Sequence, residues 1–454
     1  MRHGTLRASR RRALPLAFAA ALLALVAGSA AGAQAQTTIT VDTTSDVADF
    51  GGAQTVADLP GPDGQTSFRE ATIASTNTAG PETIAFDIPT SDPGFTGEEF
   101  VIRIDPDPVP QQVAFGLEIG DDATTIDATT QPGGFPIVVE GGPQSTTDSD
   151  GGLRIASSGN AVIGLGIRGY TNGLQVDGGS NNRIVDVTAT GNANGVTVAG
   201  REVGTGNEVS SSTVADNNRI GVAIINTVGV TVDGNTITGN GTEGVFMFGA
   251  DEVTVTNNVI SGNDFHGIEF QSESGLFVFP PDPATRGGVA SGNTITGNGG
   301  HGVRVDAADR FTITQNVTAG NAGLAIDLSG GRQDAFGVTR NDSKDRDVGA
   351  NQRLNFPERL MATDDGTATV VEGRVDFPDP QSLTIELFAN EAPDPSGFGE
   401  GETFVGTATP DAKGRFTATL PAGLAGQWIT ATATDSAGNT SEFSEAVLVG
   451  VPKK

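Results

Sequence analysis

The sequence predicts an all-β protein: a right-handed single-stranded parallel β-helix with coils of about 22 residues, followed by a small β-sandwich. First, one pattern occurs four times between Gly221 and Asn321, and each copy ends in Asn-x-x-x-Gly-Asn. Second, opening glycines recur every 21 to 26 residues from Gly152 to Gly323, apart from one interval of 35. Third, the apolar runs are short, rich in strand formers and bounded by Gly and Asn turns.

The register of the repeats predicts which side chains lie inside the coils. Parallel coils stack about 4.8 Å apart, so equivalent residues lie above one another. The repeated asparagines are expected to form a hydrogen-bonded ladder in a bend. A leucine-rich repeat would need a Leu signature that the copies lack, and a propeller blade needs about 40 residues. We expect an interior row of Val222, Val245, Ile268 and Val303.

Residues 1–36 are predicted to be a secretory signal peptide. Five arginines precede the apolar run Ala13–Ala27, and small residues then offer a cleavage site. The twin-arginine route is the alternative to general secretion. No later apolar run is long enough to span a bilayer, so we expect no membrane insertion of the mature chain. The expected location is secreted, extracellular or on the cell surface.

The charge balance restricts the partners. The chain carries a formal charge of −29, or −34 without the five N-terminal arginines, and it has no cysteine. Such a surface argues against nucleic acid and anionic lipid as partners. A polysaccharide or cell-surface glycan is the partner that we expect. Because no disulfide is possible, a continuous apolar core must hold the exported chain together.

Residues 37–150 are interpreted as an N-terminal cap with early irregular coils, and residues 151–330 as regular β-helix repeats. Ser67 and Glu70 have the spacing of a helix-capping box, which predicts a short helix through about Thr76. We expect this helix to cover the open first coil, because an exposed strand edge invites aggregation.

The N-terminal segment also carries a family resemblance. The stretch Thr66–Ala71 reads Thr-Ser-Phe-Arg-Glu-Ala and precedes Gly80–Phe86, and Thr125–Gly133 accompanies them. These stretches resemble the CSLREA-type motif of bacterial right-handed β-helix proteins, with Thr66 and Phe68 where the family often has Cys and Leu. The repeats resemble the pectin-lyase-like superfamily, which includes lyases, epimerases, hydrolases and adhesins. The resemblance implies the fold and leaves the activity open.

Residues 331–357 are interpreted as an acidic connector. Oxygen-bearing side chains alternate there ahead of a glycine, which is typical of a loop that wraps a calcium ion. A solvated acidic linker is the alternative, because aspartates are common in turns. Calcium is the cofactor that this pattern suggests, and the candidate ligands are Asp342, Asp345, Asp347 and Asn351.

Residues 358–450 are predicted to form an Ig-like β-sandwich, because longer alternating strands are separated by turn signals. The stretches Asp394–Gly401 and Thr432–Phe443 resemble the C-terminal Ig-like module that accompanies such β-helices. The chain lacks a Cys-Trp-Cys framework, so only the sandwich carries over. We expect Trp428 to lie in the core of this sandwich.

Outward positions of the repeats converge on three adjacent coils. There Glu269 would lie beside Arg304, and the two histidines of the mature chain would be vertical neighbours. Glu269 or Asp306 could act as general acid or base with a histidine assisting. The candidate catalytic residues are therefore Glu269, Asp306, Arg304, His266 and His301.

Aromatic and amide side chains near these coils suggest a sugar-binding groove. Two of the aromatic residues belong to the long insertion 272–288. Alternatively, Glu269 and Arg304 form a simple cross-strand ion pair and the phenylalanines pack as a small satellite core. The candidate substrate-binding residues are Phe246, Phe248, Gln271, Phe277 and Phe279.

Three functions follow from this pattern. The favoured one is a secreted or cell-surface module that binds carbohydrate or has an adhesive or structural role. The alternative is a polysaccharide-active enzyme, a lyase, hydrolase or epimerase, with its groove on the β-helix face. The third is a passive spacer stabilised by calcium. The sequence leans away from catalysis, since a lyase needs a strong base near acid-bound calcium and lysine does not occur before Lys344.

Overall fold

The computed structural model of the chain describes residues 36–104, 115–141, 151–200, 205–271 and 287–452. The predicted signal peptide lies outside the described residues except for Gln36. Phe277 and Phe279 of the long insertion also lie outside them. The roles of these segments stay predictions.

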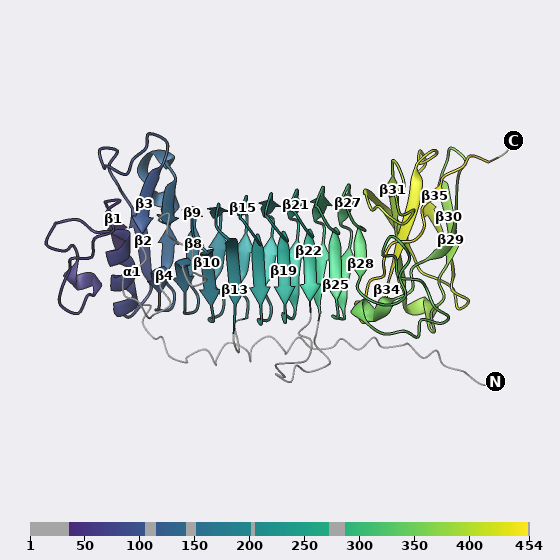
Figure 1. Cartoon of the computed structure of the whole chain (residues 1–454), viewed down its shortest axis with the longest axis horizontal. Coiled ribbons are helices and arrows are strands. Elements are labelled where there is room, and N and C mark those ends of the chain that lie inside the picture. Colours follow the sequence, from purple (N-terminus) through teal and green to yellow (C-terminus); the bar gives the residue numbers. More distant parts are fainter. Residues whose placement is uncertain (1–35, 105–114, 142–150, 201–204, 272–286, 453–454) are drawn as a thin grey trace, which may run out of the picture. The chain divides into compact units, whose positions relative to one another are not determined.

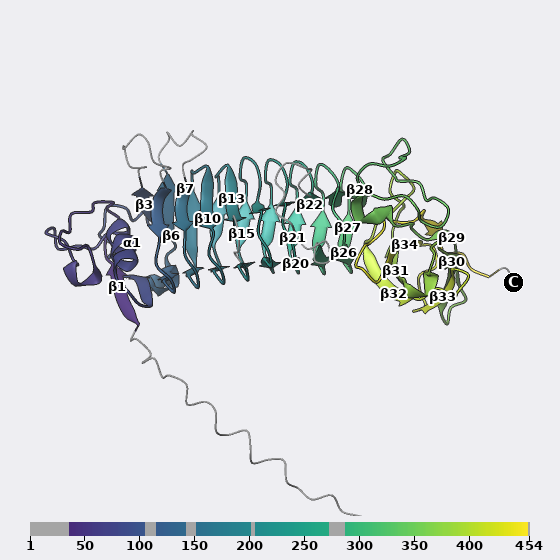
Figure 2. The same ribbon diagram turned by 90° about the horizontal axis from the view of Figure 1, so that it is seen from below.

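Short strands pair into three long parallel sheets that run side by side along the molecule (Figures 1 and 2). Successive coils pair in register: Val222 lies opposite Val245, and Val245 opposite Ile268. Backbone hydrogen bonds thus join each coil to the next, as the period predicts. The predicted parallel β-helix fold is confirmed.

The three sheets are named sheet 1, sheet 2 and sheet 3 and comprise, among the described residues, the following strands. Sheet 1 contains β1 (Thr37–Val41), β2 (Glu82–Phe86), β5 (Thr125–Asp127), β8 (Ala161–Ile163), β11 (Arg183–Val185), β14 (Glu208–Ser210), β17 (Thr231–Asp233), β20 (Val253–Thr256), β23 (Gly288–Ser291) and β26 (Phe311–Thr314). Sheet 2 contains β4 (Phe115–Ile119), β7 (Gly151–Ile155), β10 (Asn172–Asp177), β13 (Asn194–Ala199), β16 (Val222–Ile225), β19 (Val245–Phe248), β22 (Ile268–Gln271), β25 (Val303–Asp306) and β28 (Ile326–Leu328). Sheet 3 contains β3 (Phe100–Ile104), β6 (Ile137–Gly141), β9 (Leu165–Arg168), β12 (Thr188–Thr190), β15 (Thr213–Ala215), β18 (Thr236–Thr238), β21 (Val259–Ser261), β24 (Thr294–Thr296) and β27 (Val317–Ala319).

Each sheet buries one row of side chains inside the coils. The predicted interior row is confirmed, since all four of its Val and Ile side chains are fully buried. The opening glycine of each repeat is explained by close approach of the next coil. A Cβ atom on Gly244 would lie 2.7 Å from the carbonyl oxygen of Gly267 and 2.8 Å from the amide nitrogen of Asn263. A side chain at this position would therefore push the coils apart.

Two ladders of buried asparagines run along the bends. In one, the amide nitrogen of Asn235 donates to Oδ1 of Asn258 at 2.9 Å, and Asn258 donates to Asn293 at 2.9 Å. In the other, Asn240 donates to Asn263 at 2.8 Å. In Asn258 and in Asn263, Oδ1 also accepts a hydrogen bond from a backbone N–H, and Nδ2 also donates to a backbone carbonyl oxygen. The predicted ladder is confirmed, and the two asparagines of the repeated motif each build one.

Helix α1 (Phe68–Asn77) covers the first coils (Figure 1). Oγ of Ser67 accepts from the backbone of Glu70 at 3.1 Å, and the Glu70 carboxylate accepts from the backbone of Ser67 at 3.0 Å. The predicted capping box is confirmed. Arg69 donates to the carbonyl oxygen of Gly116 on β4 at 2.9 Å, which satisfies a backbone acceptor at the open edge of sheet 2.

Two antiparallel sheets follow the β-helix. They share a core that includes Val371, Ile385 and Ile429. One sheet contains β29 (Glu358–Asp364), β30 (Thr369–Arg374) and β33 (Arg415–Leu420), and the other β31 (Thr384–Asn390), β32 (Thr403–Ala408), β34 (Trp428–Thr434) and β35 (Val447–Leu448). The short 3₁₀ helices of the described residues are Val56–Asp58, Ala128–Thr130, Pro132–Gly134, Ala350–Arg353 and Pro380–Ser382.

Buried carboxylates of the C-terminal region close the last coil. The Glu386 carboxylate accepts a hydrogen bond at 3.1 Å from the backbone N–H that follows β26. Glu400 accepts one at 2.9 Å from the N–H that follows β27, and Glu442 accepts one at 3.0 Å from an N–H within β28. One carboxylate thus meets the end of each parallel sheet. Burial raises the pKa of Glu400 to about 7 and that of Glu442 to about 8. The C-terminal region therefore replaces the missing next coil.

Candidate functional site

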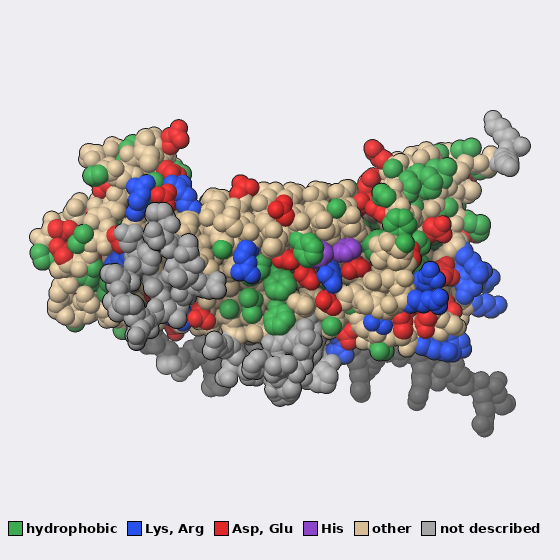
Figure 3. Space-filling model, viewed as in Figure 1, with side chains coloured by type: hydrophobic (Ala, Val, Ile, Leu, Met, Phe, Trp, Pro, Cys, Tyr) green, Lys and Arg blue, Asp and Glu red, His purple; other side chains and the backbone are tan. Residues whose placement is uncertain are grey.

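Outward side chains of sheet 2 form a mixed polar and aromatic surface over β19, β22, β25 and β28. Phe246 lies opposite Glu269, Glu269 opposite Arg304, and Arg304 opposite Asp327. Figure 3 shows the histidines of this face in purple, among acidic side chains in red and beside a hydrophobic group in green. Strand register thus brings residues from four coils to one surface.

Arg304 lies at the centre of this surface. Its Nη1 lies 3.8 Å from Oε1 of Glu269, its Nη2 lies 3.7 Å from Oδ2 of Asp306, and its Nε lies 3.6 Å from Oδ2 of Asp327. These separations exceed the roughly 2.7–3.2 Å of a hydrogen bond. The Nε atom is buried and has no hydrogen-bond partner among the described residues. The guanidinium is therefore surrounded by carboxylates without being hydrogen-bonded to any of the three.

The two histidines stack and hold defined tautomers. The backbone N–H of His301 donates to Nδ1 of His266 at 2.9 Å, and the backbone N–H of Leu324 donates to Nδ1 of His301 at 2.9 Å. Because Nδ1 accepts in both rings, the proton of each neutral imidazole lies on Nε2. Burial lowers the pKa of His266 to about 3, with His301 and Arg304 adding to the effect, and burial also lowers the pKa of His301.

The Nε2–H groups of the histidines point into the same surface. Nε2 of His266 lies 3.4 Å from Nη1 of Arg304. Both atoms carry hydrogen in this tautomer, so the contact is between two donors and is not a hydrogen bond. Nε2 of His301 lies 3.6 Å from Oδ2 of Asp327.

Glu269 is a buried carboxyl group in this surface, with 6% of its area exposed. Burial raises the pKa of Glu269 to about 7, opposed by Arg304 and supported by Glu243 and Asp306. Burial also raises the pKa of Asp327. Glu269 can therefore both donate and accept a proton near neutral pH, as a general acid or base must.

Aromatic rings flank the polar centre. The rings of Phe246 and Phe248 are half-buried and stacked, with centroids 6.4 Å apart and an interplanar angle of 15°. Phe265 is 43% exposed and its ring centroid lies 3.9 Å from that of His266. Gln271 lies opposite Phe248 at the end of β22. Phe265 belongs to this aromatic set although the repeat pattern did not single it out.

The repeat pattern also missed Asp327, for a structural reason. The repeat pattern takes Gly323 as the opening glycine of the last coil. It therefore assigns Ala325, two residues later, to the same outward row of sheet 2 as Arg304. Backbone hydrogen bonds instead join Gly323 to Gly300 and the N–H of Val303 to Ala325. Ala325 therefore takes the place of the opening glycine, and Asp327 takes the position beside Arg304.

A cavity lies on another face of the β-helix. It measures about 440 Å³ and lies between sheet 3 and residues 128–136. Its arginine, Arg168, donates to Glu140 at 2.7 Å and to Glu99 at 2.9 Å. The Arg168 guanidinium is hydrogen-bonded to two carboxylates, whereas that of Arg304 makes no hydrogen bond to a carboxylate of the described residues. We therefore place the candidate site at Arg304.

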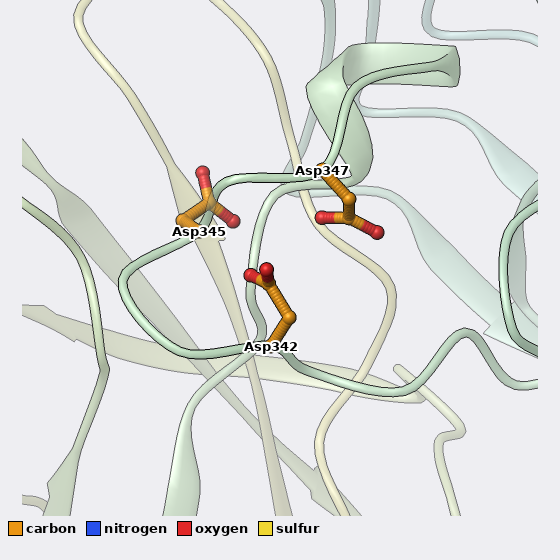
Figure 4. Close-up of side chains that lie close together, drawn as sticks. All are labelled: Asp342, Asp345 and Asp347. Atoms are coloured by element: carbon orange, nitrogen blue, oxygen red, sulfur yellow. The ribbon is translucent and has the colours of Figure 1, made fainter.

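Three of the four predicted calcium ligands lie together. Carboxylate oxygens of Asp342, Asp345 and Asp347 lie within 4.8 Å of one another (Figure 4). Burial raises the pKa of Asp345 to about 7, and the neighbouring aspartates add to the effect. Burial and the charge of Asp342 raise the pKa of Asp347. A divalent cation would relieve this repulsion.

Asn351 does not join these aspartates. Its amide nitrogen donates to the carbonyl oxygens of Phe311 at 2.7 Å and Thr440 at 3.0 Å, and its Oδ1 accepts the Phe311 N–H at 2.9 Å. The side chain is fully buried and ties the last coil to the C-terminal region. Its polar atoms are committed to backbone groups, and its role as a ligand stays a prediction.

Sequence comparison matches part of the β-helix to a known family. The family described as "Periplasmic copper-binding protein (NosD)" matches residues 138–278, which is less than half of the chain. No curated protein sequence matches this chain. Among the described residues, no helix combines the length and the apolar character needed to cross a membrane.

Several solved structures share similarity with the chain at low identity. The periplasmic alginate epimerase AlgG is 12% identical, with 54% of this chain and 71% of that chain covered and a TM-score of 0.35. A tailspike protein mutant of the E. coli bacteriophage HK620, solved with a pentasaccharide, is 10% identical, with 82% and 91% covered and a TM-score of 0.43. ORF18 of Geobacillus virus E2 is 11% identical, with 84% and 75% covered and a TM-score of 0.41. The fold assignment rests on the strand register above, and the site must be argued from its own residues.

The described residues around Arg304 do not fit a copper site. Copper favours thiolate, thioether and imidazole ligands. The chain has no cysteine, and Nδ1 of each described histidine already accepts a backbone N–H. Nε2 of His266 faces the cation of Arg304, which would repel a metal ion. The cluster of potential ligands found in the described part of the chain is made of aspartates, which suit harder cations.

Proposed function

We propose that the chain is an exported, secreted or cell-surface β-helix module that binds carbohydrate on sheet 2, around Arg304. The observation that carries this proposal is a partly exposed guanidinium that lies among three carboxylates at 3.6–3.8 Å without hydrogen-bonding to them. Beside it lie imidazole N–H groups and half-exposed aromatic rings. Sugar sites combine such convergent polar groups with apolar surface.

A binding screen tests the proposal. Purified protein without residues 1–36 is titrated with a panel of neutral and acidic polysaccharides, and the tightest binder is carried forward. The variant Arg304→Gln is expected to lose this binding, while Arg154→Gln, on the same face of sheet 2, retains it. Absence of any glycan binding, or equal binding by wild type and Arg304→Gln, would contradict the proposal.

A polysaccharide-active enzyme is the second candidate, and Glu269 favours it. The raised pKa of this carboxyl, about 7, suits proton transfer to a glycosidic oxygen or from a sugar carbon. The reducing ends or unsaturated products released from each polymer are measured. Turnover that disappears in Glu269→Gln while binding persists would support the enzyme, and binding without turnover would support the module.

The flanking regions support an adhesive or structural context. We interpret the N-terminal segment 37–150 as a CSLREA-type cap and residues 358–450 as an Ig-like module that also closes the last coil. Calcium at Asp342, Asp345 and Asp347 would stabilise the connector 331–357, which joins the β-helix repeats to the C-terminal module. A rise in melting temperature with calcium that is absent in Asp345→Asn is expected, and an unchanged melting temperature with EDTA or calcium would exclude the ion.

A further inference from the structure

Two donors at the Arg304 site have no acceptor among the residues that the structure describes. Nε of Arg304 is buried without a hydrogen-bond partner among the described residues. Nε2–H of His266 faces Nη1 of Arg304 at 3.4 Å, donor against donor, and this histidine is 2% exposed. Buried donors without acceptors are costly, so an oxygen atom from a ligand would satisfy them.

Carboxyl groups surround the same donors. Asp306 and Asp327 lie within 3.7 Å of the guanidinium, Glu269 lies 3.8 Å from it, and Glu243 interacts with Glu269. One cation therefore lies among three carboxyl groups, with Glu243 beside one of them, and burial favours the neutral form of both histidines. The site is net negative, and its oxygens require donors from the ligand.

We propose that the ligand of this site is an uncharged glycan, whose hydroxyl oxygen accepts from His266 and Arg304 while its proton is donated to a neighbouring carboxylate. A hydroxyl is one donor and two acceptors in a single group, which matches the mixture of donors and acceptors here. This inference rests on the proposed function and adds the charge class of the sugar.

An acidic sugar fits the same groups poorly. A uronate carboxylate could accept from Arg304 and His266, but it has no proton to donate to Asp306 or Asp327. It would also bring a negative charge against a net negative surface on a chain of formal charge −29. The ammonium group of a cationic sugar would donate to the carboxylates but could not accept from His266 or Arg304. The uncharged hydroxyl satisfies both sets.

Charge-matched polymers provide the test. Polygalacturonate and alginate are compared with their carboxyl-reduced, uncharged forms and with neutral glucan, mannan, xylan and galactan, in EDTA so that divalent cations cannot bridge acids. The tightest binder is expected to be neutral, and each acidic polymer is expected to bind at least about tenfold more weakly than its reduced form if that form binds. An acidic polymer that binds most tightly overturns the charge class while the proposed function stands. Failure of every polymer to bind overturns both.

A variant separates local charge from total charge. Asp306→Asn removes one carboxylate beside Arg304, and Asp177→Asn removes one from the same outward file nearer the N-terminus. Asp306→Asn is expected to narrow the difference in affinity between an acidic polymer and its reduced form. Asp177→Asn, which changes the total charge equally, is expected to leave the difference unchanged. Equal effects of the two variants would contradict local selection.

Discussion

Arg154 and Arg304 lie in one outward row of side chains on sheet 2, but they differ in how their guanidinium groups are hydrogen-bonded. Strand register links Arg154 to Arg304 through successive coils. Their side chains are almost equally exposed, 26% and 28%. Arg154 donates to Asp177 at 2.6 Å and to Glu118 at 3.1 Å, whereas the nearest carboxylate to Arg304 in the described part of the chain is 3.6 Å away. Exposure therefore does not explain the difference.

The carboxylates around Arg304 have other partners. Asp306 accepts a hydrogen bond from Ser329, Asp327 lies near Nε2 of His301, and Glu269 interacts with Glu243. Asp177 and Glu118 instead accept hydrogen bonds from Arg154. An arginine in the same outward row thus forms hydrogen-bonded ion pairs at position 154 and leaves its guanidinium without such bonds at position 304, where we propose that a ligand binds.

The largest expected effect is on binding. Arg304→Gln should weaken affinity for the glycan that binds wild type by about tenfold to a hundredfold, because hydrogen bonds to a charged group contribute about 1.5–3 kcal/mol. Arg154→Gln should change this affinity by less than about twofold. Titration calorimetry of the three proteins measures both. Equal losses in the two variants would show that the arginines are not functionally different.

The pH dependence of stability should differ through Glu269. Its folded pKa of about 7 lies above the reference value of 4.5, so its stabilising contribution is complete below pH 4.5 and is lost as pH rises through 7. In Glu269→Gln this dependence is absent. The free energy of unfolding of the variant relative to wild type should therefore rise between pH 5 and 8, by on the order of 1–3 kcal/mol.

Chemical denaturation at several pH values measures this difference. Glu400 and Glu442 have raised pKa values in both proteins, so their contributions cancel in the comparison. Parallel stability curves would contradict a raised pKa at Glu269.

Removal of the exposed aromatic ring of Phe265 should have a smaller effect on glycan binding. Phe265→Ala removes an exposed ring next to His266 and should weaken glycan affinity by about threefold to tenfold, since such a ring contributes about 0.5–1.5 kcal/mol. Val259→Ala, a partly exposed apolar residue on sheet 3, is the control and should leave affinity unchanged. Unaltered affinity in Phe265→Ala would remove this ring from the site.

The smallest expected effect is on stability, and it is the reverse of the binding effect. Arg154→Gln leaves Asp177 and Glu118 without their cation and should lower the free energy of unfolding by about 0.5–1 kcal/mol. Arg304→Gln removes a cation that lies 3.6–3.8 Å from Glu269, Asp306 and Asp327 but breaks no hydrogen bond to them, so its loss should be smaller. Urea unfolding at neutral pH compares them. A larger loss in Arg304→Gln would indicate that this arginine is structural.

Much of the fold could be predicted because the spacing of the repeated motif determines which residues pair in successive coils. The interior Val and Ile row and the asparagine ladder follow from the spacing of the motif. The same register placed Glu269 beside Arg304 and His266 beside His301. Where the spacing changes, prediction fails: the shift at Gly323 concealed Asp327.

Contacts between distant parts of the chain could not be predicted from the repeats. Glu386, Glu400 and Glu442 contact the last coil because the C-terminal sheets pack against it. The commitment of Asn351 to Phe311 depends on the same contact. No local pattern encodes these pairings, whereas Asp342, Asp345 and Asp347 lie close in sequence and were found together.

A crystal structure with a bound oligosaccharide would show where the sugar lies. We predict a sugar hydroxyl oxygen within hydrogen-bond distance of both Nε2 of His266 and the guanidinium of Arg304. A sugar bound elsewhere, for example in the cavity beside Arg168, with Arg304 hydrogen-bonded to its own carboxylates, would contradict it.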